Sequence, residues 1–375
     1  MRVALNGLFL ANPATGTGQY LRELVGAMRA EFPNDEFVLL APAADSTAPA
    51  PLEIFPTRFT RENFAKLEFE QFTFPRASAK QFDIAHVPHF GSPLFPTRPT
   101  VVTIHDLIPI ALPAYRGSAR VQLYTRLASF SAQRANAIIA DSYASARDIQ
   151  KHLHIPREKI HVVHLAAHAR FAPPSQAEIR RVRAKYNLPN HFILYLGGFD
   201  VRKNVARVIE TFERFISGES RVESREWALV LAGRLPDASG DFFPNPKQLA
   251  EKFGVLHNTH FIGFIAEEDK PSLYAAASVF LYPSQYEGFG LPTLEAMACG
   301  TPVIVANTSS LPEVVGDAGI LLSPDDARGW DDALRGLLTE ETRWNEMRAR
   351  GLEQAKKFSW TRAARETMQV YRAVV

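Results

Sequence analysis

The range Ser278–Ala306, SVFLYPSQYEGFGLPTLEAMACGTPVIVA, decides the fold. It opens with an apolar, β-rich run that ends at Pro283 and continues into a loop with two glycines. Pro292 then stands where a helix starts, because its missing N–H is not needed there, and Gly300 ends that helix. A second β-rich run, Pro302–Ala306, follows at once. This order predicts two parallel strands joined by a crossover helix.

The same alternation of β-rich runs and helical periodicity extends along the whole chain. It predicts an α/β fold in which helices cover parallel sheets. The stretch Ala166–Asn190, with Pro173-Pro174-Ser175 and many charges, predicts a linker and a short helix between two sets of strands. The expected strands are Val3–Phe9, Glu36–Ala41, Asp83–Val87, Thr100–His105, Ala137–Asp141 and Ile160–His164 in the first set, and Phe192–Gly197, Trp227–Gly233, His260–Phe264, Ser278–Pro283 and Pro302–Ala306 in the second.

We therefore expect two doubly wound, Rossmann-like domains, residues 1–168 and 169–358, that face each other across a cleft. The tail from Ala327 onward has no strand pattern, which predicts two or three helices. In the range Trp360–Ala373 apolar residues recur at spacings of three or four, so the last helix should present one apolar face.

Composition and charge exclude several classes of protein. The 375 residues are 46% hydrophobic and 22% charged, which is ordinary for a soluble globular protein. Lys and Arg number 42 against 40 Asp and Glu, so the strongly basic domain typical of nucleic-acid binding is missing. The single cysteine, Cys299, excludes an internal disulfide and suits a reducing compartment. No apolar run approaches the roughly 18 residues that span a bilayer, so we expect a cytoplasmic chain.

The loop between Pro283 and Pro292 is a candidate anion site. Its glycines allow the backbone to come close to a ligand, and the helix that follows favours a phosphate at its N-terminus. Glu287 and Glu295 flank this loop, and a rise of about 1.5 Å per residue separates them by roughly 12 Å. The carboxylate pairs of glycosidases lie roughly 5–9.5 Å apart, so this pair suits recognition of hydroxyls at two points of a ligand. Alternatively, Glu287 caps the helix and Glu295 is solvated.

Two other glycine-bearing loops follow strands. In LGGFDVRKN, residues 196–204, Arg202 and Lys203 stand before a helix, where cations suit phosphate oxygens; the alternative is a solvated pair. Gly16 and Gly18 follow the first strand. An NAD fingerprint is disfavoured, because its third glycine is replaced by a leucine and no acidic residue ends the second strand.

Histidines mark the ends of several expected strands. His105 and Asp106 end one strand at the edge where α/β sheets bind ligands, which favours a functional role. His86 and His89 are weaker candidates at the same edge. The histidines show no metal-ligand spacing, and we expect no metal site.

Residues 51–82 contain seven of the 26 phenylalanines, interleaved with basic residues. The main expectation is a helix packed on the core. The alternative is an apolar acceptor groove or a face that touches a membrane.

Taken together, these residues resemble the retaining GT-B glycosyltransferases of the family-4 group, over essentially the whole chain. The most specific part is E-G-F-G-L-P-x-x-E-A-x-A-C-G-x-P-V at Glu287–Val303, which contains an E-x7-E motif. The other matching motifs are R-K-N at Arg202–Asn204, G-T-G at Gly16–Gly18, H-D at His105-Asp106, F-x-G-F at Phe261–Phe264 and S-S-L-P-E-V at Ser309–Val314. In one departure, Gly198 stands where many relatives have Arg, so the phosphate should depend more on Arg202 and Lys203.

The resemblance implies a nucleotide-sugar donor on the C-terminal domain and an acceptor on the N-terminal domain. The implied catalytic residues are Arg202 and Lys203 at the leaving diphosphate, Glu287 at the donor sugar and His105 near it. The implied donor-binding residues are Gly16, Gly18, Phe264, Phe289, Gly290, Leu291 and Glu295, the last at the ribose. Asp106, Tyr20 and His86 are the candidates for acceptor binding. The resemblance also implies that the C-terminal helix, 359–375, packs back on the N-terminal domain.

The expected activity is therefore sugar transfer with retained configuration, without a divalent metal or another cofactor. The R-K-N loop and the H-D-L-I-P run at His105–Pro109 resemble bacterial mannosyl- or rhamnosyltransferases of surface polysaccharide assembly. This makes GDP-mannose the first choice of donor and a glycan or lipid-linked sugar the expected acceptor, with the inner face of the membrane as an alternative location. Two other functions stay open: a catalytically silent sugar-nucleotide-binding protein and a nucleotide-sugar epimerase.

Overall fold

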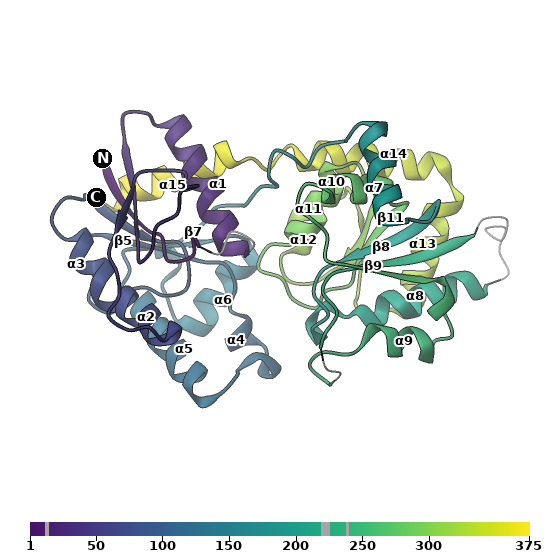
Figure 1. Ribbon diagram of the computed structural model, residues 1–375, viewed down its shortest axis with the longest axis horizontal. Helices are drawn as coiled ribbons and strands as arrows, with labels where there is room; N and C mark the ends of the chain where they lie inside the picture. The colour runs from purple at the N-terminus through teal and green to yellow at the C-terminus, as the bar shows by residue number, and fades with distance from the viewer. Residues whose placement is uncertain (12–14, 219–225, 238–239) are drawn as a thin grey trace. The chain divides into compact units, whose positions relative to one another are not determined.

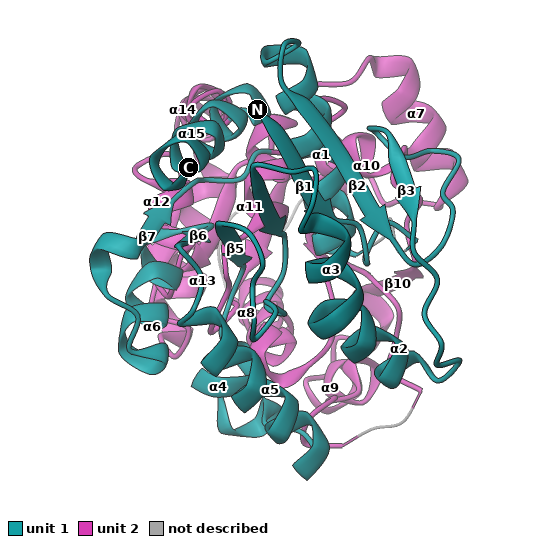
Figure 2. Cartoon of the chain, turned by 90° about the vertical axis from the view of Figure 1, so that its left-hand side faces the viewer, with its two compact units in different colours: residues 1–166, 359–375 teal, residues 167–358 magenta. Residues whose placement is uncertain are grey.

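The computed structural model describes residues 1–11, 15–218, 226–237 and 240–375. The chain divides into two compact units (Figure 2). Unit 1 comprises residues 1–166 and 359–375, and unit 2 comprises residues 167–358. The first boundary lies two residues before the expected one, and the expected linker supplies a helix, α7 (Gln176–Lys185), to unit 2. No helix among the described residues is long and apolar enough to cross a bilayer.

Unit 1 is built on a seven-stranded sheet in the order β3-β2-β1-β4-β5-β6-β7, with every neighbouring pair parallel (Figure 1). The strands are β1 (Arg2–Asn6), β2 (Glu36–Ala41), β3 (Leu52–Ile54), β4 (Ile84–Val87), β5 (Thr100–Ile104), β6 (Ala137–Ala140) and β7 (Ile160–Val162). The strand order reverses between β1 and β4, and open sheets of this kind bind ligands beyond the carboxyl ends of the strands at such a point.

Unit 2 has a six-stranded parallel sheet in the order β10-β9-β8-β11-β12-β13. Its strands are β8 (His191–Leu196), β9 (Trp227–Ala232), β10 (Thr259–Gly263), β11 (Val279–Tyr282), β12 (Val303–Ala306) and β13 (Ile320–Leu322). Here the order reverses between β8 and β11, the two strands that precede the Arg-Lys loop and the two-glycine loop. The topology therefore places both loops at one switch point.

Helices connect the strands in both units. In unit 1 they are α1 (Gly16–Glu31), α2 (Glu62–Glu68), α3 (Phe74–Ser78), α4 (Ile108–Ala111), α5 (Ala119–Ala132), α6 (Tyr143–Leu153) and α15 (Trp360–Val374), with a π-helical turn, η1 (Phe69–Thr73), between α2 and α3. In unit 2 they are α7, α8 (Val205–Ser217), α9 (Pro246–Lys252), α10 (Lys270–Ala276), α11 (Leu291–Ala298), α12 (Leu311–Val315), α13 (Ala327–Thr339) and α14 (Glu341–Ala355).

The tail forms three helices, and α15 returns to unit 1, where it lies beside α1 (Figure 1). Arg365 on α15 pairs with Glu31 at the end of α1, 2.7 Å apart. The buried face of α15 includes Met368 and Tyr371, as its apolar stripe predicts. The helix thus completes the core of unit 1.

Two short strands escaped the sequence analysis, β3 and β13. Both lie at a sheet edge, have only three residues and are at most partly buried, so they are shorter than the apolar runs that reveal the central strands. The Phe-rich segment forms α2, η1 and α3 in place of one helix; Phe69 and Phe74 are buried in the core, whereas Phe64 and Phe72 are exposed.

Candidate active site

Glu287 is the centre of a hydrogen-bonded cluster at the switch point of unit 2. Its carboxylate accepts hydrogen bonds from Lys203 Nζ and Ser284 Oγ, each at 2.6 Å, and from the Tyr282 hydroxyl at 2.9 Å. The guanidinium of Arg202 lies 2.8 Å from the same carboxylate. The side chains of Arg202 and Lys203 are 11% and 12% exposed, so the cluster is largely shielded from water.

The charges in this cluster support one another. Burial alone would raise the pKa of Glu287, but Lys203 and Arg202 outweigh it and hold that pKa below its ordinary value. Burial lowers the pKa of Lys203, and Glu287 opposes the shift. The two alternatives of a solvated cation pair and of a capping Glu287 are wrong: both cations are ion-paired, and the N-cap of α11 is Gly290.

The two-glycine loop is held in shape by its own hydrogen bonds. Gly290 has φ +105°, and a Cβ there would lie 2.6 Å from Leu311 Cδ2, so both backbone and space require glycine. Ser310 Oγ donates to the Phe289 carbonyl at 2.7 Å, and the Glu287 N–H donates to Ser309 Oγ at 2.9 Å. The S-S-L-P-E-V segment therefore fixes the backbone that leads into α11.

Glu295 lies on α11 and is buried rather than solvated. The hydroxyl of Tyr274 donates to its carboxylate at 3.0 Å. Burial, opposed by Lys270 and Tyr274, raises the pKa of Glu295 to about 7. A ligand hydroxyl that donates a hydrogen bond to this carboxylate would stabilise its charged form, because burial has removed the water that would otherwise do so.

The remaining donor candidates of unit 2 differ in exposure. Phe264, directly after β10, is 72% exposed and its ring is accessible. Phe289 is buried, with its ring edge-on to Phe358 at 5.7 Å, and its part in donor binding stays a prediction. Leu291 is the first residue of α11 and is partly exposed.

In unit 1, His105 is held between two acceptors at the carboxyl edge of the sheet. Its Nδ1 lies 2.7 Å from Asp141 Oδ2 and its Nε2 lies 3.2 Å from the Pro88 carbonyl. Both partners are hydrogen-bond acceptors, an arrangement that favours the imidazolium. Burial would lower the pKa of His105, but Asp141 outweighs it and raises that pKa above its ordinary value.

Two of the three acceptor candidates lie in the core. The Tyr20 hydroxyl and His86 Nε2 both bond to Thr103 Oγ1, at 3.0 and 2.8 Å, and the Tyr371 hydroxyl bonds to His86 Nδ1 at 2.6 Å. Burial lowers the pKa of His86 to about 3, so this histidine is neutral. Both side chains are buried: Tyr20 joins α1 to β5, and His86 joins β4 to α15, so acceptor binding by either residue stays a prediction.

The third acceptor candidate and the G-T-G motif lie at helix starts. Asp106 Oδ1 accepts the Ile108 N–H at 3.0 Å, at the beginning of α4. Gly16 and Gly18 are in the first turn of α1, and Gly18 N–H donates to Thr15 Oγ1 at 3.2 Å. Gly18 is buried, whereas a Cβ on Gly16 would meet no atom within 4 Å. The structure itself thus does not require glycine at position 16.

The sequence analysis did not identify several residues of the site. The register of the sheets would have indicated one of them, Asp141. Ile104 pairs with Ala140 in the parallel β5–β6 ladder, which sets His105 beside Asp141. Tyr282 and Ser284 were not identified because their partner, Glu287, is fixed by the folded loop. Glu70, whose buried carboxylate lies 2.9 Å from His89 Nε2, gave no sequence signal at all.

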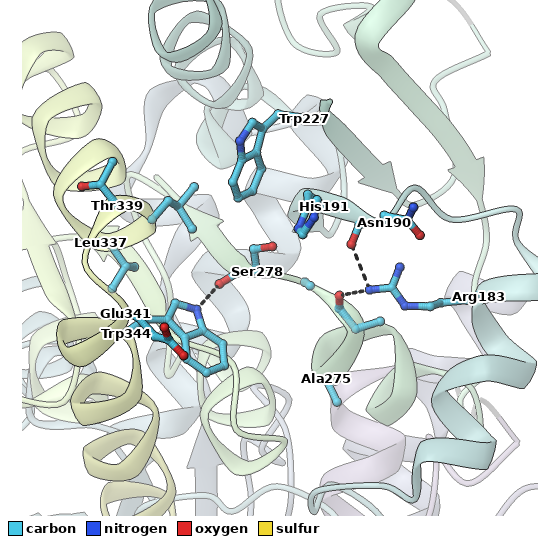
Figure 3. Close-up of a pocket in the computed structure, with 13 residues that line it drawn as sticks. Arg183, Asn190, His191, Trp227, Ala275, Ser278, Leu337, Thr339, Glu341 and Trp344 are labelled. Atoms are coloured by element: carbon cyan, nitrogen blue, oxygen red, sulfur yellow. Dashed lines mark hydrogen bonds between the residues drawn. The ribbon is translucent and has the colours of Figure 1, made fainter. Parts of the chain in front are cut away.

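A separate cavity of about 740 Å³ lies in unit 2 near the amino ends of β8 and β9 (Figure 3). His191, Trp227 and Trp344 line it, and Arg183 closes one side by donating to the Asn190 and Ala276 carbonyls. None of the candidate site residues lines this cavity, so it is distinct from the candidate active site. Among the described residues, no group of three or more His, Cys, Asp or Glu could hold a metal ion.

Comparison with known proteins places this geometry in a family. Residues 176–358 match the family model "Glycosyl transferases group 1", and residues 14–171 match "Glycosyltransferase Family 4". The O-antigen chain mannosyltransferase B of Escherichia coli is 32% identical over 96% of both chains. The serotype-specific mannosyltransferase WbdA of Escherichia coli is 33% identical over 71% of this chain, which spans 32% of that longer protein.

Solved structures show the same fold. Anabaena HepE, in complex with UDP and glucose, matches with a TM-score of 0.78 at 18% identity over 100% of both chains. WaaG, a glycosyltransferase involved in lipopolysaccharide biosynthesis, matches with a TM-score of 0.72 at 17% identity over 99% of both chains. The two parallel-sheet units therefore form a GT-B fold, and the chain belongs to the family-4 glycosyltransferases, with a family 4 N-terminal domain and a group 1 C-terminal domain.

Proposed function

We propose that this glycosyltransferase moves mannose from GDP-mannose to a glycan or lipid-linked acceptor, with retained configuration, in bacterial surface polysaccharide assembly. The cluster of Arg202, Lys203 and Glu287 carries the proposal, because it joins two cations to a carboxylate beside a helix start. The mannosyltransferases of Escherichia coli that resemble the chain support mannose as the sugar.

The cluster suits the charges that develop during transfer. When the bond between the anomeric carbon and the phosphate breaks, negative charge grows on the diphosphate and positive charge on the sugar. Arg202 and Lys203 would stabilise the first, and the start of α11 would add backbone N–H groups. Glu287 would orient the sugar through its hydroxyls, and Glu295 would accept bonds from the ribose. The acceptor oxygen would bond to the same face of the sugar while its proton passes to the departing phosphate.

Independence from divalent metals is part of the proposal. The two cations supply the neutralisation that a metal gives in other transferases. The chain contains no Asp-x-Asp, the arrangement that holds a metal against the diphosphate in the other main glycosyltransferase fold. Transfer from GDP-mannose should persist in excess EDTA, and NMR should show a product with the donor's anomeric configuration. Loss of transfer under EDTA, or an inverted product, would overturn this part.

The same assay separates the two rival functions. A panel of radiolabelled nucleotide sugars is incubated with mannose-terminated oligosaccharides, and products are separated by chromatography. A silent binding protein leaves every donor intact, and an epimerase yields a new nucleotide sugar without consuming acceptor. Transfer from another donor, such as a UDP-sugar, would correct the donor and leave the class of reaction unchanged.

Unit 1 also exposes a surface that suits an anionic membrane. Large apolar side chains are exposed before and on α2, on η1 and α5, and in the loop between β4 and β5, and Leu123 on α5 is 68% exposed. The exposed set is Phe59, Phe64, Phe72, Phe95, Val121, Leu123 and Phe130. From Leu107 to Ala140 the chain has four arginines and no Asp or Glu, so the charge here complements anionic lipid headgroups.

Membrane contact at this surface would bring the enzyme to a lipid-linked acceptor. The test is co-sedimentation with vesicles that contain phosphatidylglycerol or phosphatidylcholine alone. Leu123→Asp should abolish binding to the anionic vesicles, whereas Leu256→Asp, at an exposed leucine of unit 2, should leave it unchanged. Equal binding by both variants, or self-association of the wild type in place of vesicle binding, would overturn this contact.

A further inference from the structure

Unit 1 buries a carboxylate that the donor chemistry does not use. Glu70 has no exposed surface. It accepts hydrogen bonds from the Tyr124 hydroxyl at 2.9 Å and from His89 Nε2 at 2.9 Å, and Lys66 Nζ lies 3.9 Å away. A buried carboxylate is costly unless donors and counter-charges satisfy it. Here Tyr124 on α5 and His89 after β4 donate, and Lys66 on α2 supplies a nearby positive charge.

A π-helical turn places this carboxylate inside. In η1 the Phe74 N–H donates to the Phe69 carbonyl, five residues back. Phe69 and Glu70 in this turn, and Phe74 and Pro75 directly after it, are all buried. A π-helical turn of this kind adds one residue to an otherwise regular helix. Such turns are rare and are frequently found at functional sites.

The turn holds the loop that follows β4, at the edge of the sheet where ligands bind. Besides the bond from His89 to Glu70, Gln71 donates to the Ser92 carbonyl at 2.9 Å and accepts the Leu94 N–H at 2.8 Å. A Cβ on Gly91 would lie 2.4 Å from Glu70 Oε1, so glycine is needed for this approach. The same loop supplies the carbonyl that bonds to His105.

Three residues at the rim of this cluster, Lys66, Tyr124 and Phe9, are partly exposed. The Lys66 side chain is 31% exposed, and its ammonium lies over the rings of Tyr124 and Phe9, at 4.5 and 5.5 Å from their centroids. Both rings are partly exposed. Behind them, the buried Nδ1 of His89 has no hydrogen-bond partner, an uncommon state for a buried nitrogen.

We propose that Lys66, Tyr124 and Phe9 form a saccharide-binding subsite for the acceptor, with Glu70 and His89 as positioning residues behind it. Sugar hydroxyls accept hydrogen bonds from an ammonium, and the C–H faces of a sugar ring pack on aromatic rings. Glu70 fixes the ammonium and the Tyr124 ring in place through its contacts with both. This inference rests on the proposed function, because it assigns the acceptor of the same reaction.

The experiment compares variants of the full chain with GDP-mannose as donor and an α-linked mannose trisaccharide as acceptor. The variants are Lys66→Met, Tyr124→Phe and Glu70→Gln. Glu62→Gln is the matched control, because Glu62 lies on the same helix α2 and is exposed. For each variant we measure the KM of acceptor and donor, kcat, and hydrolysis of GDP-mannose without acceptor.

A subsite predicts a selective effect on the acceptor. In Lys66→Met and Glu70→Gln the acceptor KM should rise about tenfold or more, while donor KM and donor hydrolysis stay within about twofold of the wild type. Glu62→Gln should behave as the wild type. Tyr124→Phe removes the bond to Glu70 and keeps the ring, so its acceptor KM should rise less than that of Glu70→Gln.

Two results would overturn the subsite. One is an acceptor KM within about twofold of the wild type in folded Lys66→Met. The other is an equal loss of donor hydrolysis and transfer in all three variants, since a purely structural cluster impairs the whole enzyme. Failure of the proposed function looks different: the wild type itself would then consume no GDP-mannose. In that case, saturation-transfer NMR tests the subsite directly by measuring binding of the trisaccharide. Equal binding by the wild type and Lys66→Met would overturn the inference.

Discussion

Replacing Glu295 by glutamine should stabilise the enzyme in a pH-dependent way and lower the affinity of the enzyme for the donor. Burial raises the pKa of Glu295 from 4.5 to about 7. A carboxyl group with a raised pKa binds its proton more tightly in the folded state, so the free energy of unfolding falls as pH rises from 4.5 to 7. A shift of about 2.5 units at 1.36 kcal/mol per unit amounts to about 3 kcal/mol above pH 7.

The glutamine variant has no such loss. The difference in unfolding free energy between Glu295→Gln and the wild type should therefore grow by about 3 kcal/mol between pH 4.5 and pH 8. Urea unfolding is followed by tryptophan fluorescence in a Trp360→Phe background, which leaves Trp227, Trp330 and Trp344, all in unit 2. Glu251→Gln, at an exposed residue of α9, is the control and should give a constant difference.

The donor experiment completes the prediction. If Glu295 accepts bonds from the ribose, the variant should bind GDP more weakly by about tenfold at pH 8, the effect of one lost charged hydrogen bond. A pH-independent stability difference would refute the reasoning from burial. A stabilised variant with unchanged GDP affinity would confirm the burial and remove Glu295 from the donor site.

Three further predictions concern other parts of the fold. Lys203→Met should lower kcat by about 100- to 1,000-fold. It should also destabilise unit 2 by about 1–3 kcal/mol, because Glu287 loses a buried partner. Adding Glu287→Gln should restore the stability measured by urea unfolding but should not restore kcat. Gly16→Ala should keep or slightly raise the melting temperature, since the added Cβ meets no atom within 4 Å. If the G-T-G turn approaches the donor phosphates, the same variant should raise the donor KM. An unchanged donor KM would argue against that approach. Deleting residues 359–375 should expose unit 1 to limited proteolysis more than unit 2, because α15 supplies Met368 and Tyr371 to its core; equal protection of unit 1 would contradict this.

The sequence predicts the loops around Glu287 in unit 2 better than the buried contacts of unit 1. Glu287, Glu295, Arg202 and Lys203 lie in short motifs after central strands, and such strands have unmistakable apolar runs. Their burial was not predicted, because the partners of Glu287 come from two loops that only the sheet order brings together. The expected solvated pair and solvated Glu295 were therefore wrong.

In unit 1, residue type alone does not reveal which polar side chains are buried. His86 lies on β4, and its hydrogen bond to Tyr371 depends on α15, 285 residues further along the chain. Tyr20 lies on α1, and its hydroxyl bonds to Thr103 on β5, 83 residues away. Glu70 depends on a π-helical turn, which has no sequence periodicity that distinguishes it from an α-helix. Irregular helices and long-range packing thus account for most of the misses.

The return of α15 to unit 1 has a consequence for the order in which the protein is made. All of unit 2 is synthesised between the two parts of unit 1. Domains tend to fold as they leave the ribosome, so unit 2 can complete its sheet while unit 1 still lacks the helix whose Tyr371 bonds to the buried His86. During that interval the apolar face that α15 later covers is open to water and to chaperones. We expect ribosome-bound chains stalled near residue 358 to show a protease-resistant unit 2 beside a sensitive unit 1.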